Sequence, residues 1–381
     1  EVLFKLLINN EYNILNKVNG MWAFAFFDKE NKKLILSRDR FGKKPLFYYQ
    51  DEKNFVVASE IKVIFKIIQK DRLINNDFLA YFLLNKRWPN DCNNSTFYKD
   101  IKSIEAGEVM SLDINTFEKE SFYIKNKLKT KTIKDEKLIF DNLYSAVQLR
   151  LRADVKIGVL ISGGVDSSIV TSFACLSNKV KNNLIFYTIK ELSDDFKYAK
   201  ILAKSLGIKL RVISMEFNSD KEFTKFVNKS AEHFEVPINY SVVSLPSYII
   251  YKEIAKDGVK VVIDGTGGDE IFSCYDSDLK TIFLNNLNNL KLVNFYKYYK
   301  LFYRNVGLIS KLANILKLIL IKSKRVNNPN KLINNRYNLF RKLFKKNFLS
   351  IFNNQLSNSK ILKIDNLYDM HIYLINHGML K

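Results

Sequence analysis

The first part of the chain alternates short apolar runs with polar turns, a pattern typical of antiparallel β-structure. Residues 21–27 and 33–38 are predicted to form one pair of strands, and residues 45–49 and 55–59 a second pair. Antiparallel meanders of this kind usually pack as layered sheets, each with one face toward the core. The pattern therefore predicts a layered β domain at the beginning of the chain.

The pattern changes after residues 126–137, a segment rich in Lys, Thr, Asp and Glu that we predict to be a linker. Beyond it, short apolar runs alternate with amphipathic stretches. The predicted strands are residues 156–161, 183–189, 209–213 and 259–263, and the predicted helices are residues 138–147, 167–176 and 194–206. Alternation of strands and helices favours a parallel, doubly wound α/β sheet.

The composition is that of an ordinary globular protein, but the charge is unevenly distributed. Of the 381 residues, 47% are hydrophobic and 26% are charged, and the formal net charge is +22. Residues 281–350 contain fifteen Lys and Arg and no Asp or Glu. We interpret this region as helices with solvated basic outer faces, so nucleic acid is not the expected partner. A surface for an acidic partner, anionic lipid or RNA is the alternative.

Three further observations bear on the compartment of the protein. The longest apolar stretch near the C-terminus, residues 308–321, is interrupted by Lys311 and Lys317 and is too short to span a bilayer. The first residues lack the pattern of a secretory signal peptide. The three cysteines are scattered, which suits a reducing compartment better than a disulfide framework. We therefore expect a cytoplasmic protein without a membrane span.

The strongest chemical signal is Ser-Gly-Gly-Val-Asp-Ser-Ser at residues 162–168, between a predicted strand and a predicted helix. Two glycines let the backbone turn sharply, so that successive N–H groups can point into one concavity at a helix N-terminus. Such a concavity favours phosphate oxygens. The serine hydroxyls add donors, and Asp166 can hold a magnesium ion between phosphates. The loop is therefore predicted to bind nucleotide phosphates, although it is not the ordinary Lys-containing P-loop.

The second signal is Asp-Gly-Thr-Gly-Gly-Asp-Glu at residues 264–270, again directly after a predicted strand. In open α/β sheets, ligands bind at the carboxyl edge of the strands, and both motifs reach that edge. Asp269 would then face Asp166 as the second carboxylate for magnesium. A turn without a function is the alternative interpretation of this glycine-rich pattern.

These two motifs, in this order, resemble the synthetase domain of the asparagine synthetase family. Residues 19–25, 38–46 and 58–62 agree independently, because they resemble later strands of the family's N-terminal-nucleophile glutaminase domain. The resemblance implies a doubly wound parallel sheet of the PP-loop type (adenine nucleotide alpha-hydrolase-like), preceded by part of a glutaminase β-layer domain.

The domain boundaries follow from the same resemblance. Residues 1–125 are expected to be a partial type 2 glutamine amidotransferase domain, and residues 126–137 the linker. Residues 138–381 are expected to be an asparagine synthetase domain that is incomplete at its C-terminus. The resemblance leaves a homodimer open as the assembly.

The resemblance also implies the cofactors ATP and Mg²⁺ and a set of site residues. The residues expected to hold the nucleotide are Leu160, Ser162, Gly163, Gly164, Ser167, Ser168, Ile189, Asp264 and Gly265. Asp166 and Asp269 are expected to bind the metal and, with Thr266, to be the catalytic residues.

The implied reaction is that of a ligase, the glutamine-hydrolysing asparagine synthase. The carboxylate of aspartate attacks the α-phosphorus of ATP and forms an acyl-adenylate with release of pyrophosphate. Ammonia, supplied by glutamine in the complete protein, then displaces AMP and leaves an amide. A carboxylate is a poor electrophile until its oxygen is part of a phosphate leaving group, and the loop and the metal stabilise the departing charge.

The chain departs from the family pattern at several places. Thr266 stands where an acidic residue is frequent, and threonine cannot serve as a base at neutral pH. Asp264 replaces a usual serine. The chain begins at Glu1, without the N-terminal cysteine nucleophile of the family. We therefore expect that this chain by itself does not hydrolyse glutamine, and its missing ends raise the alternative that it binds nucleotide without turnover.

Other functions remain as alternatives. The acceptor carboxylate can instead belong to a surface sugar or a peptide, or the chain can be a PP-loop enzyme that modifies tRNA. In the first part of the chain, Arg38 and Arg40 are predicted to form structural ion pairs with carboxylates. Glu60 either caps the following helix or lines the ammonia passage that the resemblance implies.

Overall fold

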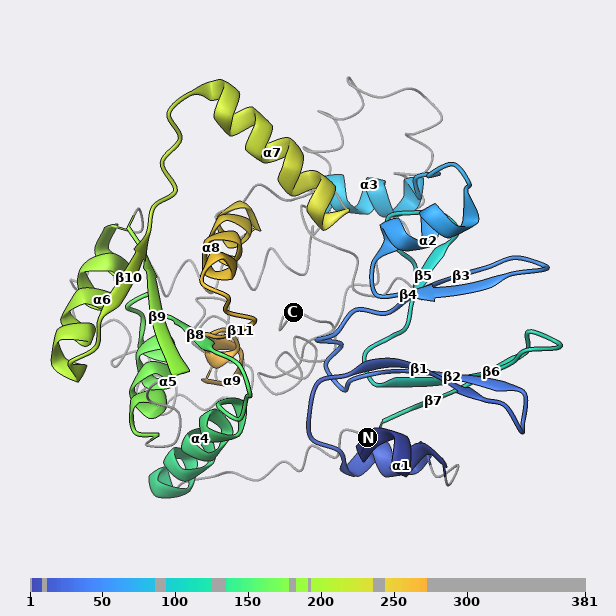
Figure 1. Cartoon of the computed structure of the whole chain (residues 1–381), viewed down its shortest axis with the longest axis horizontal. Coiled ribbons are helices and arrows are strands. Elements are labelled where there is room, and N and C mark those ends of the chain that lie inside the picture. The colour runs from blue at the N-terminus through green and yellow to red at the C-terminus, as the bar shows by residue number, and fades with distance from the viewer. Residues whose placement is uncertain are drawn as a thin grey trace, which may run out of the picture. The chain divides into compact units, whose positions relative to one another are not determined.

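The computed structural model describes two compact units, which are treated separately below (Figure 1). The described residues are 2–8, 12–85, 94–124, 135–177, 183–190, 193–235 and 244–272. The basic region 281–350 and most of the expected linker lie outside them. Among the helices that the structure describes, none has the length and hydropathy that crossing a membrane requires.

The first unit contains two antiparallel sheets and several helices. Its helices are α1 (Val2–Ile8), the 3-10 helix η1 (Tyr12–Lys17), α2 (Ile61–Ile68) and α3 (Asn76–Asn85). Its strands are β1 (Ala23–Asp28), β2 (Lys33–Arg38), β3 (Phe47–Gln50), β4 (Phe55–Ala58), β5 (Ile101–Ser103), β6 (Glu108–Asp113) and β7 (Lys119–Tyr123). The strand orders are β1-β2-β6-β7 and β4-β3-β5. Both predicted strand pairs, β1 with β2 and β3 with β4, are confirmed.

The core of this unit lies on both faces of the first sheet. Successive side chains of a strand point to opposite faces, and in β2 the neighbours Ile35 and Leu36 are both fully buried. Ile35 packs in one cluster with Leu15 and Trp22, whereas Leu36 packs in a second cluster with Tyr48 of the other sheet. Because β2 is apolar on both faces, it becomes a central strand covered on both sides.

The connection after β2 is organised by Arg38, whose side chain is 7% exposed. Its guanidinium donates hydrogen bonds to the carbonyl oxygens of Lys44 (2.7 Å), Gly42 (2.7 Å) and Ile104 (2.9 Å), and to the hydroxyl of Ser103 (3.0 Å). The prediction of an ion pair is wrong for Arg38, since these acceptors are carbonyls and a hydroxyl. Five donors in a rigid fork suit a loop with several inward-facing carbonyls.

The predictions for Arg40 and Glu60 have different outcomes. Arg40 donates to the carbonyl oxygen of Asn16 at 2.7 Å, so its acceptor is again a carbonyl and not the predicted carboxylate. Glu60 occupies the N-cap position of α2, but its side chain makes no capping hydrogen bond and instead pairs with Lys62 at 2.6 Å. The capping interpretation of Glu60 therefore holds for its backbone position and is wrong for its carboxylate.

Replacing Arg38 by methionine is expected to destabilise the first unit by about 3 kcal/mol, because several buried carbonyls lose their donor at once. The measurement is the free energy of unfolding in urea, followed by the fluorescence of Trp22, which lies in the same unit. Arg72→Met is the matched control, since Arg72 is exposed and lies over the ring of Phe65. Equal stability of the two variants would contradict the role given to Arg38.

The second unit is a parallel α/β sheet. Its helices are α4 (Glu136–Arg150), α5 (Val165–Cys175), α6 (Ser193–Leu206), α7 (Asp220–Phe234), α8 (Ser244–Lys256) and α9 (Gly268–Phe272). Its strands are β8 (Ile157–Leu160), β9 (Leu184–Ile189), β10 (Leu210–Ile213) and β11 (Val261–Ile263). The strand order is β10-β9-β8-β11 and every pairing is parallel. The chain thus moves outward from β8 to β10 and returns to the other side of β8 with β11.

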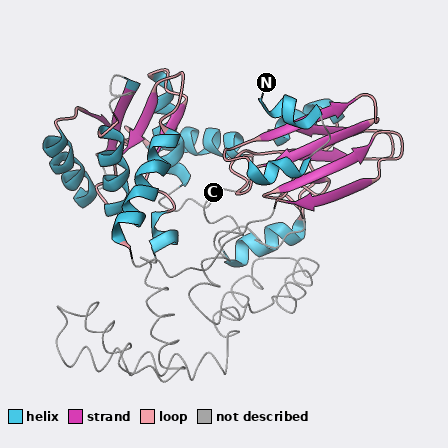
Figure 2. Cartoon of the chain, turned by 90° about the horizontal axis from the view of Figure 1, so that it is seen from below, coloured by secondary structure: helices cyan, strands magenta, loops and turns pink. Residues whose placement is uncertain are grey.

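Helices cover both faces of this sheet, as Figure 2 shows. On one face, Ile157 and Val159 of β8 pack with Ala174 of α5 and Ala199 of α6. On the other face, Tyr187 of β9 packs with residues of α8. The predicted doubly wound sheet is confirmed. Its strands are short apolar runs because both faces are buried.

The helix predicted at residues 138–147 is confirmed as α4, although none of its residues is fully buried. Phe140 and Tyr144 pack on the ring of Phe173 of α5, and Val147 packs against the core of the sheet. The beginning of α4 is fixed by Asp135, whose carboxylate accepts hydrogen bonds from the N–H groups of Lys137 and Leu138.

Candidate functional site

Both glycine-rich motifs lie at the carboxyl edge of the parallel sheet, on neighbouring strands. The first follows β8 and the second follows β11, and these strands pair with Ile263 opposite Val159. The strand order reverses at this point, since β9 lies on the other side of β8. Helices leaving neighbouring strands in opposite directions open a crevice at such a switch point, where ligands of doubly wound sheets bind.

The first loop is held in shape by its own serines. The hydroxyls of Ser162 and Ser167 share a hydrogen bond of 2.9 Å, and the N–H of Gly164 donates to Ser162 Oγ at 3.3 Å. Ser168 Oγ donates to the carbonyl of Gly164 at 2.8 Å. The hydroxyls that the sequence suggested as phosphate donors therefore organise the loop. Helix α5 begins at Val165, and no side chain caps its N-terminus, which leaves its first N–H groups without partners inside the helix.

The same loop packs directly against α6. Gly163 has a φ of +91°, and a Cβ added to it would lie 2.3 Å from the carbonyl oxygen of Asp195 and 3.0 Å from the nitrogen of Ala199. Only glycine fits both the conformation and the space. No local sequence pattern indicates this contact, because α6 begins about 30 residues further along the chain than Gly163.

The two motifs meet at Asp166. A Cβ on Gly268 would lie 2.3 Å from Asp166 Cγ, and a Cβ on Gly265 would lie 2.5 Å from the backbone nitrogen of Ser167. The backbone N–H of Asp269 donates a hydrogen bond to the Asp166 carboxylate. The glycines of the second motif thus allow its turn to approach the start of α5 closely, and the predicted proximity of Asp166 and Asp269 agrees with this contact.

Negative charge converges at this contact. The pKa of Asp166 is raised, first by its burial and then by the nearby carboxylates of Asp269 and Glu270. Glu270 is 6% exposed. The only sequence signal for Glu270 is its place in the second motif, directly after Asp269.

The donor set fits a magnesium ion in its chemistry. Magnesium prefers oxygen ligands and takes one or two protein carboxylates together with phosphates and water. A cation between Asp166 and Asp269 would relieve the repulsion that raises the pKa of Asp166. Within the described part of the chain, no group of three or more His, Cys, Asp or Glu is arranged to hold a metal by itself. Phosphate oxygens would have to complete the coordination.

The residues expected to hold the nucleoside lie beside this pair. Leu160 and Ile189 end the neighbouring strands β8 and β9 and belong to the same apolar cluster. Asp264 follows β11, and its Oδ1 accepts the N–H of Thr266 at 3.0 Å, closing the turn. The side chain of Thr266 is exposed at the tip of this turn.

A further residue that the sequence did not indicate lies near enough to the same turn to feel its charge. Tyr251 of α8 is 46% exposed, and its pKa is raised first by its partial burial and then by the charge of Asp264. No motif points to it, because its place depends on how α8 packs on the sheet. The edge of the sheet thus carries apolar groups at β8 and β9 and acidic groups at the turn after β11.

Comparison with known proteins agrees with both units. Residues 139–358 match the asparagine synthase family, and residues 1–123 match the glutamine amidotransferase domain family.

Two proteins of Methanocaldococcus jannaschii are similar to this chain. Both carry a provisional name, asparagine synthetase (glutamine-hydrolyzing), with the numbers 1 and 2. Number 1 is 34% identical over 299 residues, which are 74% of this chain and 51% of that protein. Number 2 is 31% identical over 290 residues, which are 73% of this chain and 54% of that protein. The amidase chyE of Penicillium rubens is 25% identical over 299 residues, 73% of this chain and 43% of that protein.

The chain spans about half the length of the two archaeal relatives. The asparagine synthase match covers more than half of this chain and includes the sheet, both glycine-rich loops and the pair Asp166 and Asp269. On this match, the chain belongs to the asparagine synthase family.

Proposed function

We propose that the protein to which this chain belongs is an ATP-dependent ligase that amidates a carboxylate, with glutamine as its nitrogen source. The observation that carries the proposal is the contact of the two glycine-rich loops at Asp166, at the switch point of the parallel sheet. We also propose that residues 1–125 belong to the amidotransferase domain, that residues 126–137 are a linker and that the synthetase domain begins at residue 138.

In the proposed first step, an oxygen of the acceptor carboxylate forms a bond to the α-phosphorus of ATP, and the bond between that phosphorus and the bridging oxygen breaks. Pyrophosphate leaves with the electron pair. The N-terminus of α5 lies where the loop amides and the helix dipole would stabilise this charge. Magnesium, held by Asp166 and Asp269, would neutralise the phosphate oxygens.

In the proposed second step, ammonia adds to the acyl carbon, the carbon–oxygen bond to AMP breaks, and the proton lost from nitrogen passes to solvent or to a basic group of the substrates. Thr266 is exposed at the tip of its turn but lacks a group that is basic at neutral pH. We therefore propose that Thr266 contacts the reactants without acting as the base. Asp264 and Gly265 would hold the nucleoside from the same turn.

Aspartate is the acceptor that we propose, following the family name. Another carboxylate is the second candidate, because Thr266 and Asp264 stand where the family usually has other residues and one relative is named an amidase. Modification of tRNA is not proposed, since the match to the asparagine synthase family covers the sheet and both loops.

The test is formation of AMP and pyrophosphate from ATP and magnesium with ammonium chloride, with and without aspartate. Asp166→Asn and Asp269→Asn are each expected to lower the rate by at least about 100-fold, because the metal and the phosphates lose a charged ligand. Asp154→Asn is the matched control, since Asp154 is exposed and precedes β8, at the opposite end of that strand.

Binding of ATP with magnesium, measured by calorimetry, gives a second readout that does not require turnover. Asp166→Asn and Asp269→Asn are both expected to weaken this binding, whereas the control Asp154→Asn is expected to leave it unchanged. Unchanged nucleotide binding in both edge variants would overturn the site. If the protein binds ATP but aspartate does not stimulate AMP release, the acceptor is a carboxylate other than aspartate.

A further inference from the structure

The first unit contains a cavity that has no part in the proposed nucleotide site. Its volume is about 330 Å³, near the lower end of the range for small-molecule sites. Tyr48 and Gln50 of β3, Lys102 of β5 and Lys119 of β7 line it, so the two sheets of the unit both contribute.

Two of the residues that line this cavity, Lys102 and Lys119, carry ammonium groups. The pKa of Lys119 is lowered, first by burial and then by the positive charge of Lys102. Lys119 lies 5.3 Å from the ring centroid of Tyr48 and donates a hydrogen bond to Gln50 Oε1. Among the residues that the structure describes, no carboxylate lies within ion-pair distance of either lysine. The pair therefore presents positive charge that protein groups do not neutralise directly.

Two acids around this cavity, Glu108 and Asp51, are engaged with other donors. Glu108 acts on Lys119 only through its charge, because its carboxylate accepts the N–H of Glu105 at 2.7 Å and the hydroxyl of Ser121 at 2.8 Å. Asp51 also lines the cavity, but its carboxylate is saturated with donors.

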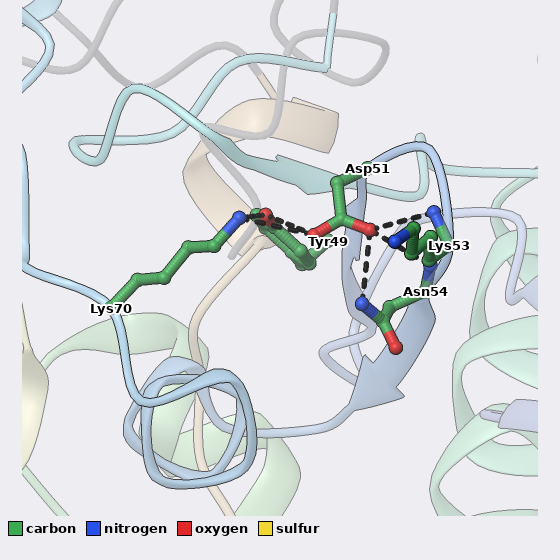
Figure 3. Close-up of polar contacts among 5 residues, drawn as sticks. All are labelled: Tyr49, Asp51, Lys53, Asn54 and Lys70. Atoms are coloured by element: carbon green, nitrogen blue, oxygen red, sulfur yellow. Dashed lines mark hydrogen bonds and ion pairs between the residues drawn. The ribbon is translucent and has the colours of Figure 1, made fainter.

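Figure 3 shows how Asp51 is held. It accepts hydrogen bonds from Lys70 Nζ at 3.0 Å and from the hydroxyl of Tyr49 at 2.9 Å. On its other side it accepts the N–H groups of Lys53 (3.0 Å) and Asn54 (2.8 Å). These contacts stabilise the turn between β3 and β4, which carries one wall of the cavity.

Two exposed carboxylates complete the lining. Glu52 follows Asp51 on the fixed turn, and Asp100 immediately precedes β5. In the described part of the chain, neither makes an ion pair with Lys102 or Lys119, although all four side chains line one cavity. Opposite charges kept apart around one small volume are complementary to a ligand that carries both charges itself.

We propose that this cavity binds a small zwitterion of the α-amino-acid class. The ligand carboxylate lies against Lys102 and Lys119, and its ammonium group lies against Glu52 and Asp100. The ring of Tyr48, which is 4% exposed, forms the apolar floor. A simple anion would meet the lysines but would also be repelled by the two carboxylates. None of the lining residues belongs to the second unit or to the proposed nucleotide site.

The test is a two-dimensional NMR titration of the chain with L-serine and other L-α-amino acids, using acetate and ethylammonium as probes that carry one charge each. We expect the amino acids to shift the backbone resonances of Gln50, Lys102 and Lys119, and the single-charge probes to bind more weakly. Lys119→Met and Asp100→Asn are each expected to weaken amino-acid binding by about tenfold, the loss of one charged hydrogen bond.

Lys99→Met is the matched control, because Lys99 is exposed and adjacent in sequence but does not line the cavity. Binding of ATP with magnesium is expected to be unchanged in every one of these variants, and so is thermal stability. Equal binding of acetate and the amino acids would overturn the proposal in favour of a plain anion site. Unaltered amino-acid affinity in both Lys119→Met and Asp100→Asn would overturn it altogether.

Discussion

Gly268→Ala is expected to lower AMP formation by at least about 100-fold, because displacing a catalytic group by roughly 1 Å has effects of that size. The added Cβ would lie 2.3 Å from Asp166 Cγ and Oδ2, so the carboxylate must rotate out of its place. The carboxylate is the free end of a side chain, and the fold can accommodate its movement. We therefore expect the free energy of unfolding to fall by only about 1 kcal/mol. The measurements are AMP release and unfolding in urea on the same preparation.

Asp166→Ala provides an internal control for this explanation. Removal of the carboxylate removes the three atoms nearest to the methyl group on residue 268. Adding Gly268→Ala to Asp166→Ala should therefore not weaken ATP–magnesium binding further. Non-additivity of this kind is the signature of two groups in contact. Gly20→Ala, at a position with no heavy atom within 4 Å of the added Cβ, controls for the substitution itself. Additive effects on binding would show that Gly268 acts by another route.

Gly163→Ala is expected to have the larger effect on stability, with a loss of about 3 kcal/mol. Its Cβ would meet the backbone oxygen of Asp195 at 2.3 Å, and backbone cannot move aside as a side-chain end can. The φ of +91° adds strain for any residue other than glycine. The loop must then separate from α6, so nucleotide binding should be lost together with stability. Urea unfolding and calorimetric ATP binding check both consequences.

The adjacent glycine is the matched control. Gly164 has a φ of −70°, and a Cβ there would meet only Ser162 Oγ, at an ordinary contact distance of 3.5 Å. We expect Gly164→Ala to unfold at nearly the same urea concentration as the unchanged protein. Comparable losses at both positions would mean that the loop requires general flexibility and that the contact with α6 is not the cause.

The main features of both folds were predictable from local patterns. Apolar alternation located β1 to β4, and short fully apolar runs located β8 to β11, because burial on one or both faces leaves a direct trace in the side chains. The end of α6 was predictable from Gly207, whose φ of +63° is the left-handed conformation that terminates helices. The Ser-Gly-Gly loop was predictable because its chemistry is local to one strand–helix junction.

The differences arise where the partner of a residue is distant in sequence. Arg38 was expected to pair with a carboxylate, but the loop that it supports supplies carbonyls, and one of them comes from Ile104. Arg40 was expected to pair with a carboxylate as well, but it donates to the carbonyl oxygen of Asn16, 24 residues away. In both cases residue type indicated that a partner exists, and only the packing of separate elements could choose it.

By itself, the sequence indicated the candidate site residues, since glycines, serines and carboxylates directly after apolar strands are expected at the ligand-binding edge of a sheet. It also determined the order of the strands along the chain and therefore a parallel sheet. The tertiary structure alone decided that β11 lies beside β8, which brings Gly265 and Gly268 against Asp166. The physical reason is that contacts between loops depend on which strands are neighbours, and strand order is set by burial of the whole sheet rather than by any local pattern.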